Sequence, residues 1–311
     1  MKLTEEEIKQ FKNAFFRSFI THLNDMIGDR WNIRFKVHNP RKGDKEDTKD
    51  IDKNTALILW GDECSQIFPT LYHQSSGAII KCYCPEAWIQ QGIIPMTDNA
   101  MIYEENEAAS STPCSQRPYT VFYSANLNYR RTDLYRGLTG KNYGWPFRIS
   151  SNYPQTGKYP LWHKIEAVMM HRLITKHSKQ LDFSDLYPNS YIRFHNGFMK
   201  GTLPQEEYEH RMKNSKLSWC TAGFMTNETS RLLESAYAGT AVICGNLPDT
   251  PIYRGHPFVI INDWRKIRQV TDSLLNTPSR LDEIGTLGKQ WFNTHFSPKA
   301  QAERIAKILA R

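Results

Sequence analysis

Short apolar runs of strand length are spaced along the first third of the chain, between polar stretches. Some alternate apolar and polar side chains, as one-sided strands do, and others are apolar throughout. The run TALILW ends at Gly61, a residue type that often forms the turn after a strand. The pattern predicts strands at residues 31–38, 55–60, 78–84 and 99–103.

The N-terminal segment, residues 4–27, has the apolar spacing of an amphipathic helix. Thr4 precedes three acidic residues and makes a good N-cap. We favour a helix packed on its own domain. Because Lys9, Lys12 and Arg17 accompany the aromatic side chains, a helix lying on a membrane surface is the alternative.

Strands and helices alternate through the rest of the chain. Strand-like segments occur at 119–125, 147–150, 190–197, 216–223, 240–245 and 257–262. Helical segments occur at 128–138, 161–177, 204–215, 228–239, 263–276, 279–294 and 297–310. This alternation predicts βαβ units and parallel sheets.

The stretch 104–118 is acidic, then rich in small residues, then proline-bearing, which is typical of a linker. We therefore predict an α/β fold of two Rossmann-like domains facing a cleft. The predicted domains are residues 1–115 and 116–311. The last helix is a candidate to return to the first domain.

The charge balance points to an anionic partner, because the chain of 311 residues has a formal net charge of +8. No apolar run is long enough to span a membrane, and the N-terminus lacks the pattern of a signal peptide. Six cysteines do not make a disulfide framework here, so we expect a reducing cytoplasm. The spacing of Cys82 and Cys84 fits alternating strand positions better than a metal knuckle.

The loop at residues 224–230 leads directly into a helix whose first turn carries Arg231. Free N–H groups at a helix N-terminus bind anions, and an arginine fork suits a diphosphate. Glu234, one turn further on, could accept both hydroxyls of a ribose. Ordinary capping by Thr226 or Asn227 explains the same pattern equally well on physical grounds.

The segment SKLSWCTAGFMTNETSRLLESAYAGTAVI resembles the donor-binding core of GT-B glycosyltransferases, and their exostosin-like group in particular. The segments YTVFYSANLNYRRTDLY, QEEYEHRMKNSK and FSPKAQAERIAKIL resemble other parts of the same domain, so the resemblance covers residues 118–311. Ala241 stands where the family has proline, and Thr229 and Ser230 stand where it has an acidic residue.

The resemblance implies roles for individual residues. Arg231 would contact the donor diphosphate, and Glu234 would bind the ribose. Arg130 or Arg131 would meet the phosphates at the first βα turn of the second domain. Cations and a helix dipole can stabilise a leaving diphosphate, so the resemblance implies an enzyme that needs no metal and no cofactor. The remaining implied donor-site residues are Thr226, Asn227, Thr229 and Ser230.

A glycosyltransferase that inverts the anomeric configuration of the sugar needs a base that deprotonates the acceptor hydroxyl. Asp62 and Glu63, just beyond the strand at 55–60, are the candidates in the first domain. Asp50 and Asp52 spell the D-x-D of metal-dependent transferases, but they precede the strand instead of following it. The rival bases are His73 and His195.

We thus predict a hexosyl- or pentosyltransferase that moves a sugar from a nucleotide-sugar to a hydroxyl of a glycan or glycolipid. A UDP-sugar is the favoured donor. The alternative is a non-catalytic nucleotide- or glycan-binding module on the same fold. The missing membrane anchor favours a bacterial or viral relative that works in the cytoplasm. Peripheral attachment to the inner face of the membrane is the alternative location. Basic and aromatic residues are scattered without a nucleic-acid motif, so no nucleic acid is expected.

Overall fold

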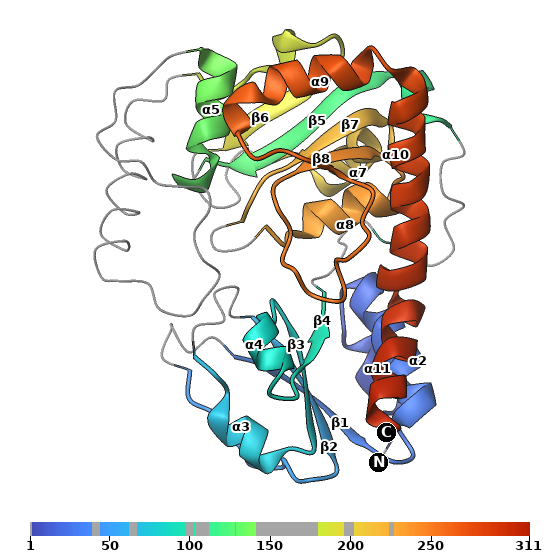
Figure 1. Cartoon of the computed structure of the whole chain (residues 1–311). Helices are drawn as coiled ribbons and strands as arrows, with labels where there is room; N and C mark the ends of the chain where they lie inside the picture. The colour runs from blue at the N-terminus through green and yellow to red at the C-terminus, as the bar shows by residue number, and fades with distance from the viewer. Residues whose placement is uncertain are drawn as a thin grey trace.

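The protein contains two separate parallel β-sheets, one in each half of the chain (Figure 1). This confirms the predicted α/β class. The computed structural model describes residues 2–38, 44–61, 67–97, 103, 112–127, 129–140, 180–195, 202–223 and 227–311.

The first sheet has the strand order β1-β2-β3-β4, and all neighbouring strands are parallel. Helices α3 (Thr70–Ser75) and α4 (Glu86–Ile89) lie in the connections that follow β2 and β3. The first three strands confirm the prediction, whereas β4 was missed because it is short and contains Pro95, a residue that argues against a strand. Of the strand predicted at 99–103, residues 99–102 lie outside the described residues. The strands are β1 (Asn32–Val37), β2 (Thr55–Trp60), β3 (Ala78–Cys82) and β4 (Ile94–Met96).

The single helix predicted over 4–27 is two helices, α1 (Glu5–Lys9) and α2 (Ala14–Ile27). Thr4 caps α1 as predicted, in a reciprocal capping box with Glu7. The prediction missed a second cap: the Asn13 side chain accepts a hydrogen bond of 2.8 Å from the Phe16 N–H. An N-cap inside a periodic segment begins a new helix, which explains the break.

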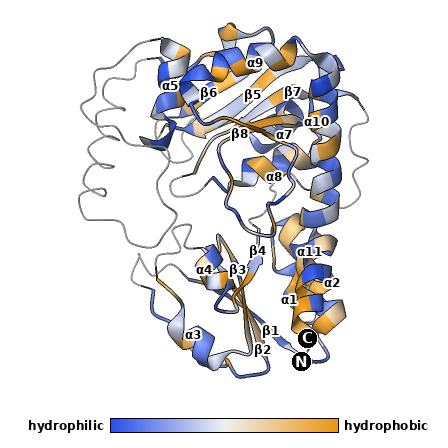
Figure 2. Cartoon of the chain, in the orientation of Figure 1, coloured by the Kyte–Doolittle hydropathy of each residue, from blue (hydrophilic) through white to orange (hydrophobic). Residues whose placement is uncertain are grey.

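The apolar face of α2 is buried inside the protein, so the membrane-surface interpretation of this helix is wrong. Phe19 and Leu23 are fully buried in one cluster with Ala302 and Ile305 of α11 (Pro298–Leu309). The two helices lie side by side at the lower right of Figure 1, and Figure 2 shows hydrophobic residues on both. In the part of the chain that the structure describes, no helix is both long and apolar enough to cross a membrane.

The second sheet has the strand order β6-β5-β7-β8-β9 and is also parallel throughout. Its strands match the predicted segments, apart from the strand at 147–150 and the helix at 161–177, which lie outside the described residues. The strands are β5 (Tyr119–Asn126), β6 (Tyr191–His195), β7 (Ser215–Cys220), β8 (Ala241–Cys244) and β9 (Val259–Ile260). The helices are α5 (Thr132–Thr139), α7 (Gln205–Lys213), α8 (Ser230–Tyr237), α9 (Ile267–Leu275) and α10 (Pro278–Trp291).

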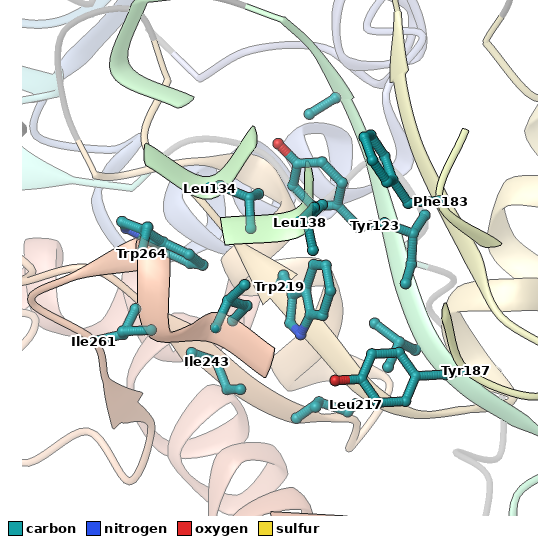
Figure 3. Close-up of a cluster of buried hydrophobic side chains, with 14 of the residues drawn as sticks. Tyr123, Leu134, Leu138, Phe183, Tyr187, Leu217, Trp219, Ile243, Ile261 and Trp264 are labelled. Carbon is teal, nitrogen blue, oxygen red and sulfur yellow. The ribbon is translucent and has the colours of Figure 1, made fainter. Parts of the chain in front are cut away.

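Helices cover both faces of the second sheet, so alternate strand residues enter two different cores. Figure 3 shows the core on one face, where the fully buried Trp219 packs near Tyr123 and Tyr187. On the other face Phe122 packs with Leu233 of α8. This double winding places the first strand, β5, between β6 and β7.

The chain crosses between the halves after β4 and returns between α10 and α11, which run down the right of Figure 1. A π-helical turn, Phe292–Phe296, joins the two helices. The predicted domain boundary at 115–116 falls within the 3₁₀ turn Cys114–Gln116. This turn is held to the second half by Ser115, whose N–H and hydroxyl donate to Asp282 at 2.7 and 2.8 Å. The boundary itself stays a prediction.

Candidate functional site

The carboxyl ends of β5 and β7 form the topological switch point of the second sheet. The connection from β5 leads to β6 on one side, and the later strands continue on the other side from β7. In open α/β sheets of this kind, ligands bind in the crevice outside the carboxyl ends at the switch point. Several predicted donor-site residues gather at this place.

Arg131 ties the two switch-point strands together. Its Nε donates to the carbonyl of Ala222, beyond β7, at 3.0 Å, and its Nη1 donates to the carbonyl of Asn126 at the end of β5. The side chain is buried. Arg131 therefore acts first as part of the framework, and it adds a positive charge to the crevice wall.

Arg231 reaches the same crevice from the first turn of α8. Its Nη2 donates to the carbonyl of Ser124 in β5, and its guanidinium lies 5.8 Å from the centre of the Tyr123 ring. Its Nε and Nη1, and the hydroxyl of Thr229, are buried and have no hydrogen-bond partner among the described residues. Buried donors without an acceptor are unfavourable, so this cluster is suited to an anion.

The N-terminus of α8 adds its free N–H groups to this cluster. Thr229 precedes the helix in an extended conformation and makes no side-chain cap, and Ser230 is the first helical residue. The orphan N–H groups of the first turn and the helix dipole both favour negative charge here. Asn227 does not cap α8 as the alternative prediction had it, because its side chain bonds to Arg130 and to the Asn246 carbonyl.

Asn227 belongs to a chain of amides that extends from the arginines across the sheet edge. Its Oδ1 accepts from Arg130 at 3.3 Å, and its Nδ2 donates to the carbonyl of Asn246, just beyond β8. The Asn246 amide in turn donates to Asn262, beyond β9, at 2.8 Å. A Cβ at Gly245 would lie only 3.2 Å from the Asn227 amide, so a glycine suits this approach.

Glu234 is buried, with 2% of its surface exposed, and not on an open helix face. Its Oε2 accepts a hydrogen bond of 2.7 Å from the hydroxyl of Tyr208 in α7. Burial raises the pKa of Tyr208 well above its usual range, and the Glu234 charge adds to this effect. Tyr208 is therefore a stable donor at neutral pH, and the sequence analysis did not identify it.

Ser124 and His195 form a further polar pair at this edge. The Ser124 hydroxyl lies 2.9 Å from Nε2 of His195, and both residues are buried. Since the Ser124 carbonyl also accepts from Arg231, the pair supports the arginine from the side of β6. The sequence analysis named His195 as a rival base but did not pair it with Ser124, because no pattern relates one strand's serine to the next strand's histidine.

The first half contributes its own strand ends. The buried Lys81 in β3 donates to the carbonyls of Gly61 and Cys82 at 3.1 and 3.2 Å, and this fixes the end of β2. Burial raises the pKa of the Cys84 thiol to about 12, while Lys81 lowers it and the charge of Glu228 raises it. The β3 end therefore lies near the segment that leads into α8.

Some predicted residues are not placed at this site. The candidate bases Asp62 and Glu63, and Thr226, lie outside the described residues. Asp52 accepts from the Thr55 hydroxyl at 2.7 Å in the turn before β2, which is the amino end of the sheet. The D-x-D residues are thus at the end of the strand opposite to Gly61, as their sequence position suggested.

The sequence matches no protein-family model and no curated protein. Solved structures with a similar chain path include the N-terminal domain of Candida albicans trehalose-6-phosphate phosphatase, at 8% identity and a TM-score of 0.47 over 100% of this chain and 77% of that one. Another is Anabaena HepE in complex with UDP and glucose, with 11% sequence identity and a TM-score of 0.45 over 96% of this chain and 76% of that one. A third is an alpha-glucosyltransferase in complex with UDP-glucose and DNA containing an abasic site, with 11% sequence identity and a TM-score of 0.45 over 96% of this chain and 84% of that one. Such distant likeness leaves the functional argument to the site itself.

Proposed function

We propose that the protein is a glycosyltransferase of the GT-B type that uses a nucleotide-sugar donor. The observation that supports this proposal is the cationic cluster at the switch point of the second sheet. Arg231, Arg130 and the N-terminus of α8 meet there, and Arg231 has buried donors without partners among the described residues. The exostosin-like likeness of residues 215–243 supports the same donor class.

The chemistry follows from charge development. When the bond between sugar and nucleotide breaks, the leaving nucleoside diphosphate gains negative charge. Preorganised cations and N–H groups lower the barrier because they stabilise that charge without reorganising. We assign this task to Arg231 and Arg130, with the Ser230 end of α8, while Arg131 keeps the crevice in shape.

Glu234 is proposed to bind the ribose, because it lies on α8 one turn beyond Arg231. Asp62 or Glu63 is proposed as the base, because both follow directly on β2. The proposal also includes independence from metal ions, a UDP-sugar as the donor, and a glycan or glycolipid as the acceptor. A cytoplasmic location remains a prediction.

The first experiment is a thermal-shift panel with UDP, GDP, CMP, ADP and TDP. A nucleotide at about 100 times its dissociation constant stabilises the folded state by roughly 2.7 kcal/mol, so the preferred base should stand out. If no nucleotide raises the melting temperature, the donor-site assignment is wrong.

The second experiment measures turnover of the matching nucleotide-sugars, with and without glycan acceptors and with and without EDTA. We expect hydrolysis or transfer that chelation leaves unchanged. Loss of activity in EDTA and its recovery with Mn²⁺ or Mg²⁺ would contradict the metal-independent mechanism. Tight nucleotide binding without turnover of any donor would indicate a binding module instead.

A further inference from the structure

Asn126 is the last residue of β5, at the switch point of the second sheet. Its backbone carbonyl accepts a hydrogen bond from Arg131, which holds the backbone in place. Its side-chain Oδ1 is buried and has no hydrogen-bond partner among the described residues. A buried amide oxygen without a donor is unfavourable, and such atoms are rare in folded proteins. The side chain is therefore suited to a partner that the described part of the chain does not supply.

Alternation along β5 places this side chain on the face of the sheet that α8 covers. Phe122, four residues earlier, packs with Leu233 of α8. Residues two apart in a strand point to the same face, so Ser124 and Asn126 follow Phe122 on it. The Ser124 carbonyl accepts from Arg231, and residues two apart lie about 7 Å from one another along a strand. The Asn126 amide and the Arg231 guanidinium thus border the same end of the crevice.

The atoms without partners at this place are of two kinds. Arg231 offers buried N–H donors and a positive charge, whereas Asn126 offers an uncharged acceptor. The donors suit an anion, but an ionised group cannot satisfy the acceptor, because it brings no hydrogen to donate. A ligand that satisfies both must carry a hydroxyl or an N–H group close to its anionic group. A nucleotide-sugar has this chemistry, since its diphosphate joins a sugar and a nucleoside that both carry hydroxyls.

The amide chain of the site indicates which half of such a ligand lies near β5. From Asn227 it extends to Asn246 and Asn262, which are exposed beyond β8 and β9. Planar amides can pair with the polar edge of a nucleobase. Strand β7 separates β5 from β8, and β6 lies on the far side of β5. The nucleoside therefore fits toward β8, and the sugar fits toward β5 and β6.

We propose that the Oδ1 of Asn126 binds a hydroxyl of the donor sugar, while Arg231 and the N-terminus of α8 hold the diphosphate. The inference rests on the proposed function and extends it to a residue that the sequence analysis did not select. It implies that affinity for the sugar and affinity for the nucleoside diphosphate can be lost separately.

The test measures binding by calorimetry, without an acceptor. The ligands are the nucleoside diphosphate preferred in the thermal-shift panel and its conjugates with glucose, N-acetylglucosamine and xylose. A hydrogen bond between uncharged groups has a modest net strength, so Asn126→Ala should weaken the best-bound conjugate by about 3- to 10-fold. Its affinity for the nucleoside diphosphate should change less than about twofold. Arg231→Ala should weaken both kinds of ligand, because both carry the diphosphate.

The stability of the unliganded protein is a second readout. Asn126→Leu keeps the approximate size of the side chain and removes the buried oxygen. Since no described residue bonds to that oxygen, the melting temperature should stay at the wild-type value or rise. Asn276→Ala, at the exposed end of α9, is the control for the binding measurements and should leave both affinities unchanged.

The outcomes separate the two proposals. If the wild-type protein binds none of the nucleotide-sugars, the proposed function and this inference both fall. If it binds them, and Asn126→Ala weakens the nucleoside diphosphate as much as the conjugate, or weakens neither, only the inference falls. A clear drop in the melting temperature of Asn126→Leu would also overturn the inference, since the amide would then have a structural partner.

Discussion

Arg231 and Arg131 reach the same crevice but differ in their hydrogen bonds. Arg131 donates to two backbone carbonyls on neighbouring strands, whereas Arg231 keeps two buried nitrogens without a partner among the described residues. The first arrangement is typical of a framework residue and the second of a ligand-binding residue. Substitution should separate these roles.

We expect Arg231→Ala to lower kcat for the nucleotide-sugar by at least about 10²-fold, because removing one preorganised donor typically has this effect. Because this variant leaves one carbonyl, that of Ser124, without its donor and Arg131→Ala leaves two, its melting temperature should fall less than that of Arg131→Ala. Arg131→Ala should affect turnover less and stability more, by about 1–3 kcal/mol for each carbonyl left unsatisfied. Steady-state kinetics and thermal unfolding test both variants.

Arg265→Ala is a suitable control, since this exposed arginine forms an ion pair with Asp263 at 2.8 Å. It should change neither quantity appreciably. A folded Arg231→Ala protein with near wild-type turnover would remove Arg231 from the site.

His256 gives a pH-dependent prediction at the same scale. Its Nδ1 accepts from the Phe258 N–H at 3.3 Å, its ring stacks on Phe258, and burial lowers its pKa. In the unfolded chain the His256 side chain is protonated below about pH 6.5, whereas in the folded protein its lowered pKa keeps it neutral to a lower pH. The folded state is therefore fully stable with respect to this group above about pH 6.5, and it loses stability as the pH falls below that value.

Unfolding by urea at about pH 7.5 and about pH 5.5 measures the effect. The wild-type protein should lose more stability between these values than His256→Gln, which does not titrate in this range. The exposed His295 offers the matched substitution, His295→Gln, which should keep the wild-type pH dependence. Equal losses in the wild-type protein and His256→Gln would contradict the prediction.

At the scale of elements, the end of α8 determines how the chain enters β8. Gly239 has a φ of +62°, which L-residues with a side chain rarely adopt. The nearest atoms to a Cβ at this position lie at 3.5 Å, which is an ordinary contact. Any cost of Gly239→Ala therefore comes from the backbone and not from packing.

We expect Gly239→Ala to reduce the free energy of unfolding by about 1–2 kcal/mol. Gly140, after α5, has a φ of +64°, and no atom of the described residues lies within 4 Å of a Cβ there, so Gly140→Ala should have a similar effect. Chemical denaturation compares the two variants. A much larger loss for Gly239→Ala would show that packing contributes after all.

For the whole molecule, one helix holds both places where the chain crosses between the halves. Gln301 of α11 accepts from the Thr97 N–H at 3.0 Å and donates to the Phe296 carbonyl at 3.1 Å. Arg304 donates to the carbonyls of His295 and Pro95 at 3.0 and 3.4 Å, and burial lowers its pKa to about 10. The end of β4 and the π-helical turn are thus held by the same two side chains.

Gln301→Leu keeps the size of the side chain but removes both bonds. Each buried backbone group left unpaired costs about 1–3 kcal/mol, so we expect a marked loss of stability. We also expect faster proteolysis close to Thr97, since its backbone N–H loses this partner. The exposed Gln269→Leu is the control, and unchanged stability in Gln301→Leu would contradict the role of this side chain.

Local patterns were sufficient to predict most elements and to select candidate residues for the site. Alternation and apolar runs predicted β2, β5, β7 and β8, because parallel strands buried on both faces are short and apolar. Arg231 and Glu234 could be selected as candidates because both lie on one short helix after a loop, so their spacing is local. The same locality explains the errors: Asn13 and Pro95 act through single positions that a periodic pattern averages out.

Only the tertiary structure decided which polar residues meet. The pairs Tyr208–Glu234 and Ser124–His195 join elements far apart in the sequence, and the order of strands places β5 beside β7. The tertiary structure also decided that the apolar face of α2 packs against α11 and not against a membrane. An amphipathic sequence predicts that one face of a helix is buried, but it does not predict which partner covers that face. Sequence alone determined the kinds of elements and the charges available, because these depend on neighbouring residues. The site depends on the crossing of distant segments, which no local spacing encodes.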